Sequence, residues 1–245
     1  MIFSKKNIKL ITSLQQKKYR QKHGLFVAEG VKVVNELLNS KMELYGLFGT
    51  EDSTEKINSD RITIITEEEL KKISTLKTPN KVLAIFKIPR NRSQEETEDI
   101  EVVLDGINDP GNLGTIIRLC DWFGVKKLIC SKNTVDCYNS KVIQATMGSL
   151  TRVYIEYVDL VAYLESKNFP IYITDMEGDN IYQTNLPEKA IIVMGNEANG
   201  ISQEIKSLIN KKLTIPRFGN VQQTESLNVA TATSILLSEF RRSLV

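Results

Sequence analysis

Polar residues that could act on a ligand gather in three short stretches of this 245-residue chain. The first runs from Asn108 to Gly114 and is followed by Arg118, the second runs from Met194 to Gly200, and the third joins Ile215-Pro216 to Ser226–Ala230. Each follows a short apolar run or opens a helix, so it lies at a junction where open α/β sheets place ligands. The sequence therefore predicts one site assembled from three distant stretches.

Arg118 and Asn112 carry the chemistry of the first stretch. The guanidinium group of Arg118 presents N–H donors in a fixed fork, which suits a phosphate or an oxygen that gains negative charge. The amide of Asn112 can donate and accept. The alternative for Arg118 is an ordinary helix-surface pair with Asp121, three residues later.

The other stretches supply one acid and two residues typical of helix starts. Glu197 is either a fixed acceptor or an exposed loop acid, and Ser226 and Asn228 straddle the start of the last predicted helix, where capping is their usual role. His23 is the only histidine, so a reaction here proceeds without a histidine base from the C-terminal part. The three cysteines lack C-x-x-C spacing, which argues against a metal site or a disulfide framework.

Two common nucleotide-binding patterns are absent. The turn over residues 106–114 lacks G-x-G-x-x-G, and the chain contains no G-K-[S/T], so we expect neither an NAD(P) site nor a P-loop. Apolar runs also stay below the roughly 18 residues of a membrane helix, and the N-terminus lacks the apolar core of a signal peptide. These features predict a soluble, cytoplasmic protein without membrane partners.

Charge is distributed unevenly along the chain. Residues 1–92 contain 18 Lys and Arg against 10 Asp and Glu, whereas residues 93–245 contain 14 against 20. A basic surface supplies sequence-independent affinity for nucleic acid, and a solvated lysine-rich face is the alternative. The candidate contacts are basic side chains near the N-terminus: Lys5, Lys6, Lys17, Lys18, Arg20 and Lys22.

Apolar periodicity divides the chain into two α/β parts joined by a polar linker at 93–100. The first part, 1–92, is predicted to contain helices over 9–22, 31–38 and 66–74 and strands over 44–48, 61–65 and 81–88, with Thr66 and Glu69 forming a capping box. The second part, 101–245, alternates strands over 102–104, 128–130, 153–158, 171–174, 190–194 and 213–215 with helices over 113–123, 140–150, 160–167 and 227–242. That alternation predicts a parallel sheet covered on both faces.

The three stretches together resemble the SpoU (TrmH-like) branch of the SPOUT superfamily, the S-adenosylmethionine-dependent RNA ribose 2′-O-methyltransferases. The resemblance covers residues 101–242 and rests on 109–118, on 193–201 and on 215–216 with 226–229, while Lys141-Val142 and Met147–Ser149 match a further family stretch. More weakly, residues 7–38, with Phe26–Gly30, look like the family's N-terminal substrate-binding domain.

The resemblance implies a fold, a cofactor and an assembly. The fold is a C-terminal SPOUT α/β-knot with a deep trefoil knot and a mostly parallel sheet, preceded by a smaller L30e-like α/β RNA-binding domain. The assembly is a homodimer with its active site at the subunit interface. S-adenosylmethionine would contact chiefly Gly195, Ile215 and Leu227, with further residues close by: Met194, Asn196, Pro216, Ser226 and Asn228.

The implied reaction transfers a methyl group in line to a ribose 2′-hydroxyl. Because arginine stays protonated in ordinary settings, we expect Arg118 to hold an RNA phosphate and stabilise the nascent alkoxide; a role as base requires a strongly perturbed site. Asn112 would orient the ribose or Arg118, and Glu197 would fix the loop and the substrate. Ser226 and Asn228 would position the reacting groups.

Ribosomal RNA is the expected substrate, because the two-domain arrangement resembles ribosomal members of the family. Transfer RNA is one alternative, and a non-catalytic RNA-binding or ribosome-assembly factor is another; an antibiotic-resistance methylase would be chemically the same enzyme. Two departures from the family pattern matter. Segment 220–225 lengthens the loop expected over the cofactor, and Gln144 stands where many relatives carry arginine, which argues against an RNA contact by that helix.

Overall fold

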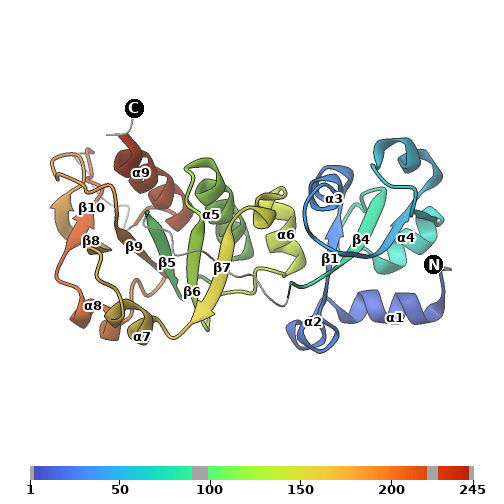
Figure 1. Ribbon diagram of the computed structural model, residues 1–245, viewed down its shortest axis with the longest axis horizontal. Coiled ribbons are helices and arrows are strands. Elements are labelled where there is room, and N and C mark those ends of the chain that lie inside the picture. Colours follow the sequence, from blue (N-terminus) through green and yellow to red (C-terminus); the bar gives the residue numbers. More distant parts are fainter. Residues whose placement is uncertain (1–2, 90–98, 220–225, 243–245) are drawn as a thin grey trace. The chain divides into compact units, whose positions relative to one another are not determined.

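The computed structural model describes residues 3–89, 99–219 and 226–242, so most of the predicted linker and the segment 220–225 lie outside the described residues (Figure 1). The chain forms two compact units. The first comprises residues up to 93 together with 136–151, and the second comprises 94–135 and 152–245. Among the described residues, no helix has the length and apolar character needed to cross a membrane.

The first unit is built on a four-stranded sheet of order β1-β4-β2-β3. Its strands are β1 (Leu25–Glu29), β2 (Leu44–Gly49), β3 (Thr63–Ile64) and β4 (Val82–Lys87). Strand β4 is antiparallel to β1 and β2, and β3 is parallel to β2. The helices are α1 (Lys5–Ser13), α2 (Lys17–His23), α3 (Val31–Leu38) and α4 (Glu67–Ile73), with a 3₁₀ helix over Glu51–Lys56. Buried side chains of α1 and α4 meet the sheet around Phe48.

Two local predictions for this unit have different outcomes. The capping box is confirmed, because Thr66 Oγ1 accepts from the N–H of Glu69 and the Glu69 carboxylate accepts from the N–H of Thr66. The single helix over 9–22 is wrong, since Leu14 to Gln16 separate α1 from α2 and Gln16 is extended. Leu14 at that break is buried in the core, so packing interrupts the helical pattern.

The second unit contains a six-stranded sheet of order β10-β8-β9-β5-β6-β7 in which every neighbouring pair is parallel. Its strands are β5 (Glu101–Asp105), β6 (Lys127–Ser131), β7 (Tyr154–Val158), β8 (Ile171–Asn180), β9 (Ile191–Gly195) and β10 (Lys212–Thr214). The predicted parallel sheet is confirmed. Strand β8 runs six residues beyond its predicted end at residue 174.

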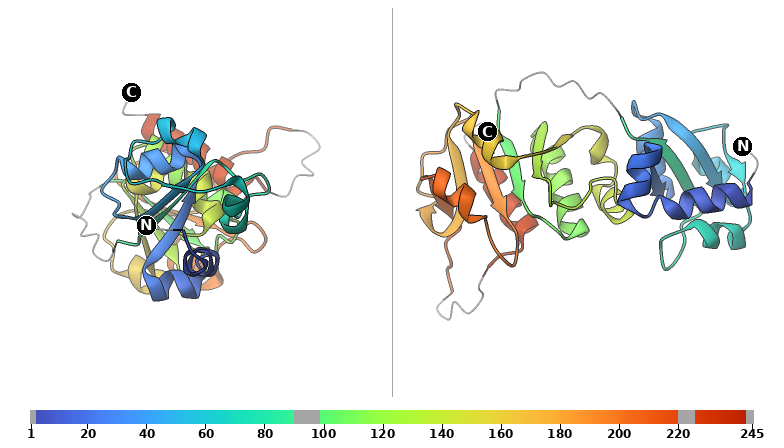
Figure 2. Two further views of the ribbon diagram at one scale, coloured as in Figure 1. Left: turned by 90° about the vertical axis from the view of Figure 1, so that its right-hand side faces the viewer. Right: turned by 90° about the horizontal axis from the view of Figure 1, so that it is seen from below.

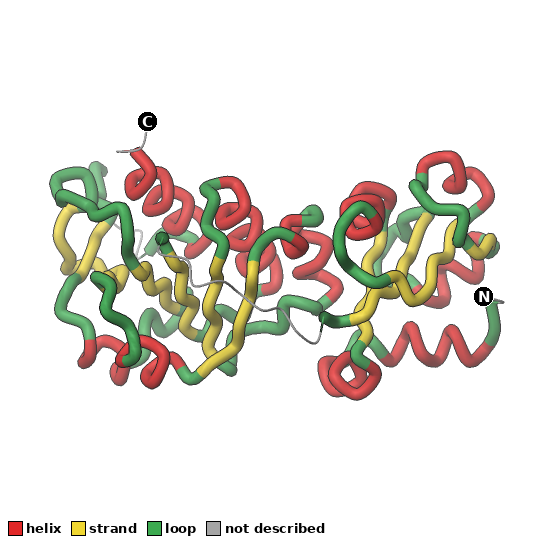
Figure 3. The backbone as a smooth tube through the Cα atoms, viewed as in Figure 1, coloured by secondary structure: helices red, strands yellow, loops and turns green. Residues whose placement is uncertain are grey.

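Helices cover both faces of this sheet, as predicted. They are α5 (Pro110–Trp122), α7 (Leu160–Glu165), α8 (Gln203–Leu208) and α9 (Val229–Arg242). Figure 1 shows α5 and α9 on one face and α7 and α8 on the other, and the right-hand view of Figure 2 and the tube in Figure 3 show the strands between them. Leu164 of α7 and Ile205 of α8 share one buried cluster with the strands. Helix α8 was not predicted.

The segment 136–151 follows β6 in sequence but belongs to the first unit. The predicted helix over 140–150 ends early: α6 spans Ser140–Thr146, because Met147 and Gly148 take left-handed conformations with φ of 51° and 97°. The Tyr138 ring lies 4.9 Å from the Phe26 ring of β1. Sequence reasoning placed this segment with the C-terminal domain, whereas it clusters with the first unit, where α6 contacts β1.

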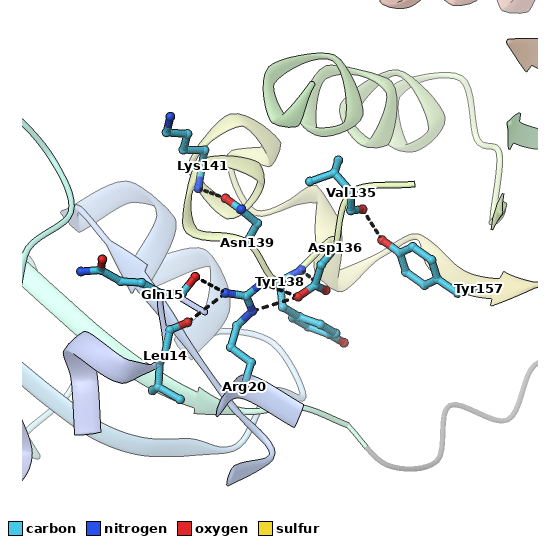
Figure 4. A network of polar contacts seen from close by, with 9 residues as sticks. All are labelled: Leu14, Gln15, Arg20, Val135, Asp136, Tyr138, Asn139, Lys141 and Tyr157. Atoms are coloured by element: carbon cyan, nitrogen blue, oxygen red, sulfur yellow. Dashed lines mark hydrogen bonds and ion pairs between the residues drawn. The ribbon is translucent and has the colours of Figure 1, made fainter. Parts of the chain in front are cut away.

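A buried arginine fastens this segment to the helices of the first unit (Figure 4). Nη1 of Arg20 donates to the carbonyls of Leu14 and Gln15 at 2.9 and 2.8 Å, and Nε and Nη2 donate to Asp136 Oδ2 at 2.9 and 2.6 Å. Arg20 is only 2% exposed. The prediction that Arg20 contacts RNA is therefore wrong, because its guanidinium group is enclosed and occupied by internal acceptors.

Candidate active site

The loop after β9 folds back on its own backbone. Asn196 and Gly200 exchange two backbone hydrogen bonds of 2.9 and 2.8 Å, and the Asn196 Oδ1 accepts from the N–H groups of Ala198 and Asn199. Gly200 is left-handed with φ of 67°. A Cβ on Gly195 would lie 2.4 Å from the carbonyl carbon of Gly200 and from the Ile201 nitrogen, so this turn excludes a side chain at Gly195.

Two hydrogen bonds fix this loop to the adjacent strand β5. Nδ2 of Asn196 donates to the carbonyl of Gly106 at 2.6 Å, and the N–H of Ser202 donates to Asp105 Oδ2 at 2.7 Å. Asp105 is the last residue of β5 and is buried. Because β5 and β9 are parallel neighbours, the loops at their carboxyl ends meet and hold each other in place.

Side-chain caps begin the two helices that face this loop. Asp109 accepts from the N–H of Asn112 at 2.8 Å to begin α5, whose first residue is Pro110. Asn228 Oδ1 accepts from the N–H groups of Ala230 and Thr231 to begin α9. Of the two predicted capping residues, Asn228 therefore caps the helix.

One hydrogen-bonded chain joins all three predicted stretches. Nδ2 of Asn112 donates to Glu197 Oε1 at 2.5 Å, and Nδ2 of Asn228 donates to Asn112 Oδ1 at 2.9 Å. Both ends of the Asn112 amide are engaged, so its orientation is set by its neighbours. We call these three residues the Asn112–Glu197–Asn228 network.

A cavity of 360 Å³ lies beside the network, against the middle of β8, the carboxyl ends of β9 and β10 and the start of α9. Six of the eight predicted cofactor residues line it: Met194, Gly195, Asn196, Ile215, Ser226 and Leu227. The other two, Pro216 and Asn228, are sequence neighbours of lining residues. Glu197 lines the cavity and is also a member of the network.

Sequence reasoning missed a whole wall of this cavity. Thr174, Asp175 and Met176 of β8 line it, as do apolar residues of β10 and α9: Leu213, Val229, Ala232 and Leu236. Residues 174–176 lie inside β8, which continues to Asn180, so the strand-end rule that selects the other stretches does not indicate them. These residues also belong to none of the family motifs.

The wall formed by β8 carries one half of an ion pair. Asp175 pairs with Lys206 at 3.3 Å and accepts from the N–H of Glu177 at 3.2 Å. Burial raises the pKa of Asp175, but these two partners and the nearby charge of Lys212 outweigh burial and leave the pKa below its ordinary value. Lys206 also lines the cavity and balances the charge of Asp175, so the cavity combines an apolar wall with one ion pair and the carboxylate of Glu197.

Arg118 lies apart from this arrangement within one chain. It is exposed on α5, outside the cavity lining, and has no hydrogen-bond or ion-pair partner among residues 3–89, 99–219 and 226–242. The alternative pairing with Asp121 is not formed, and Asp121 instead accepts from Arg152 at 2.9 Å. The remaining predicted RNA contacts are exposed on α1 and α2: Lys5, Lys6, Lys17, Lys18 and Lys22.

Comparison with known families assigns both parts of the chain. The model of the SpoU rRNA Methylase family matches residues 99–238, and the model of an MRM3-like substrate binding domain matches residues 5–84. The first match includes the network and the cavity, and the second ends within β4.

Individual relatives span nearly the whole chain. A Bacillus subtilis 23S rRNA (guanosine(2553)-2′-O)-methyltransferase, RlmP, is 29% identical over 93% of each chain. A solved structure described as a TrmH-family RNA methyltransferase from Porphyromonas gingivalis is 36% identical, covers 99% of this chain and 100% of its own, and has a TM-score of 0.86. An S-adenosylmethionine-bound rRNA methyltransferase from Sinorhizobium meliloti is 28% identical over 100% and 98%, with a TM-score of 0.85.

Proposed function

The chain belongs to the SpoU rRNA methylase family, and on that premise we propose that it transfers a methyl group from S-adenosylmethionine to a ribose 2′-hydroxyl of ribosomal RNA. The observation that carries the proposal is the Asn112–Glu197–Asn228 network beside the 360 Å³ cavity. The network draws one residue from each of three stretches far apart in sequence. Its side chains supply oriented acceptors and donors next to a space for a cofactor.

The residues around the cavity fit S-adenosylmethionine. The cavity volume of 360 Å³ lies within the range of about 300–1,000 Å³ typical of small-molecule sites. Leu213, Ile215 and Leu236 offer an apolar wall for a ring, and the carboxylate of Glu197 balances a cationic centre. When bound, the cofactor supplies an electrophilic methyl group on a sulfonium sulfur.

The network positions the substrate ribose. Because Asn112 is held between Glu197 Oε1 and Asn228 Nδ2, the Glu197 carboxylate keeps one orientation at the cavity edge. That carboxylate holds the ribose by accepting from a hydroxyl group. Asn228 also fixes the start of α9, so the network and the neighbouring cavity residue Leu227 keep one geometry.

Arg118 supplies the positive charge that the network lacks. Its guanidinium group holds an RNA phosphate and stabilises the oxygen that becomes negative as the methyl group is transferred. Since Arg118 has no role at the cavity of its own chain, we assign it to the site of the opposite protomer in a homodimer. A trefoil knot and a cytoplasmic location, both implied by the family resemblance, complete the proposal.

The first unit chooses the RNA. Its match to a substrate binding domain and its exposed lysines on α1 and α2 support this role. Segment 136–151 belongs to the same unit, so cutting the chain after residue 92 would uncover the apolar face that α6 and Tyr138 share with β1. The role of this unit is therefore better tested by surface substitutions in the full chain.

Transfer of labelled methyl from S-adenosylmethionine to unmodified total RNA tests the proposal. We expect label in ribosomal RNA within alkali-resistant dinucleotides, because a 2′-O-methyl group blocks alkaline cleavage, and no label with Arg118→Ala. Label found only in transfer RNA would show that transfer RNA, and not ribosomal RNA, is the substrate. Cofactor binding without transfer to naked RNA or to immature ribosomal subunits would favour a non-catalytic RNA-binding factor.

A further inference from the structure

A second cavity, of 230 Å³, lies wholly within the first unit. It is lined by Glu29 at the end of β1, by Thr75 to Lys77 after α4, and by the α6 residues Ser140, Lys141 and Gln144. Its volume lies below the range of about 300–1,000 Å³ typical of sites for whole small molecules. The size suits one group inserted from a larger ligand.

Glu29 gives this cavity a rigid, acidic floor. The residue is 3% exposed and accepts from Ser74 Oγ at 2.5 Å, from the Thr75 N–H at 2.9 Å and from Thr75 Oγ1 at 2.7 Å. An ionised carboxylate offers about four acceptor positions, so these three bonds leave room for one further N–H donor. The same bonds hold the backbone that leads to Lys77.

The rim of the cavity is basic and carries one neutral amide. Lys77 and Lys141 are exposed, and their Nζ atoms have no ion-pair partner within the described ranges. Gln144 is partly buried on α6 and can both donate and accept. A carboxylate and an amide within the cavity, with two ammonium groups at its mouth, match a base that carries an amino group, followed by its phosphates.

We propose that this cavity binds one unstacked nucleotide of the RNA substrate, with its amino-bearing base against Glu29 and Gln144 and its phosphates at Lys77 and Lys141. Proteins that read RNA sequence commonly take up bases splayed out of loops and bulges and bind their edges. This inference rests on the proposed function, since it takes RNA as the substrate. It also reverses the expectation for Gln144: a neutral amide on α6 reads a base edge where an arginine would bind phosphate.

The first test compares two double variants of the full chain that remove equal charge. Lys77→Ala with Lys141→Ala removes both positive charges from the rim of the cavity. Lys41→Ala with Lys56→Ala removes two exposed lysines of the same unit outside the cavity. We expect the rim variant to lower the slope of log affinity against log salt by about 1.4 for single-stranded RNA, and to weaken RNA binding more than the control. Equal losses in the two variants would overturn the proposal.

The second test locates the bound nucleotide. In substrate RNA with single abasic positions, wild-type protein should lose about tenfold in affinity at one position that normally carries G, C or A. Gln144→Ala should show a smaller loss at that position and unchanged losses elsewhere. An abasic profile identical in Gln144→Ala and wild-type protein would overturn the proposal.

Both tests measure RNA binding by fluorescence anisotropy without S-adenosylmethionine, so they do not depend on turnover. A normal affinity for S-adenosylmethionine in each variant, measured by titration calorimetry, shows that the second unit is intact. Absence of methyl transfer by the wild-type protein would contradict the proposed function and leave the abasic profile interpretable. Methyl transfer with an unchanged Gln144→Ala profile would contradict only the nucleotide cavity.

Discussion

Asn228 donates a 2.9 Å hydrogen bond to Asn112 across a separation of 116 residues. The same Asn228 side chain accepts from the first N–H groups of α9, and Asn112 passes the contact on to Glu197. Asn228 therefore caps α9 through Oδ1, which stabilises the helix, and orients the Asn112 amide through Nδ2. Substitutions can separate the two.

Asn228→Asp should preserve stability and impair methyl transfer. The aspartate keeps an oxygen that caps α9 but cannot donate to Asn112, whereas Asn228→Ala loses both functions and should cost about 1 kcal/mol of stability. Thermal unfolding and methyl-transfer rates of both variants test this. Wild-type turnover in Asn228→Asp would show that the bond to Asn112 has no role in the reaction.

Arg118→Ala should lower kcat by about 10²–10³-fold, because one charge that stabilises the reacting oxygen is lost. Its affinity for S-adenosylmethionine should stay within about twofold of the wild type, since Arg118 is not among the residues that line the 360 Å³ cavity. Isothermal titration calorimetry and single-turnover rates measure the two quantities separately. Loss of cofactor binding in this variant would place Arg118 at the cavity instead.

Mixing Arg118→Ala with Asn228→Asp tests whether the site is shared between protomers. If Arg118 serves the opposite protomer, randomly mixed dimers should recover about a quarter of the wild-type rate, because half of the dimers then contain one intact site. Subunits are mixed by co-expression with two affinity tags. If the mixed dimers recover no activity, Arg118 and Asn228 act in the same chain.

Gly195→Ala should destabilise the protein by about 1–3 kcal/mol and abolish cofactor binding, because the new Cβ would meet backbone atoms of Gly200 and Ile201 at 2.4 Å. The matched control is Gly219→Ala, since a Cβ there meets nothing within 4 Å. Chemical unfolding and cofactor titration distinguish the two variants. A wild-type unfolding curve for Gly195→Ala would contradict the tight closure of this loop.

Arg20→Ala should destabilise the first unit by about 3–5 kcal/mol, because it leaves Asp136 as a poorly compensated charge. Lys22→Ala, two residues later and exposed, should leave stability within about 0.5 kcal/mol of the wild type and reduce only the salt-dependent part of RNA affinity. Urea unfolding and RNA titration at several salt concentrations separate these effects. If Arg20→Ala instead keeps wild-type stability and lowers RNA affinity, Arg20 is an RNA contact after all.

Asp175 should make stability depend on acid pH. Its pKa in the folded protein lies below the ordinary value, so the ionised form stabilises the fold at neutral pH, and this contribution is lost as the pH falls through the folded pKa. Asp175→Asn should therefore be less stable than the wild type at pH 7 and approach it in strong acid. If the difference in unfolding free energy between Asp175→Asn and the wild type is the same at pH 7 and in strong acid, the ion pair with Lys206 does not stabilise the fold.

The sequence by itself determined the parallel architecture of the second unit and most of the site. Short apolar strands that alternate with helices bury a parallel sheet, and its carboxyl ends share one edge, so strand-end residues such as Asn112 and Glu197 were expected to meet before any contact was known. Local caps were equally readable, because Thr66 and Glu69 bond within one helical turn.

Tertiary structure alone decided the rest, because it depends on partners that are remote in sequence. A lysine-rich N-terminus cannot indicate that Arg20 turns inward to Asp136, 116 positions away, or that α6 joins the first unit. The wall at Asp175 and the floor at Glu29 are likewise set by which elements pack together. Periodicity reports which face of an element is buried, whereas packing decides what that face meets.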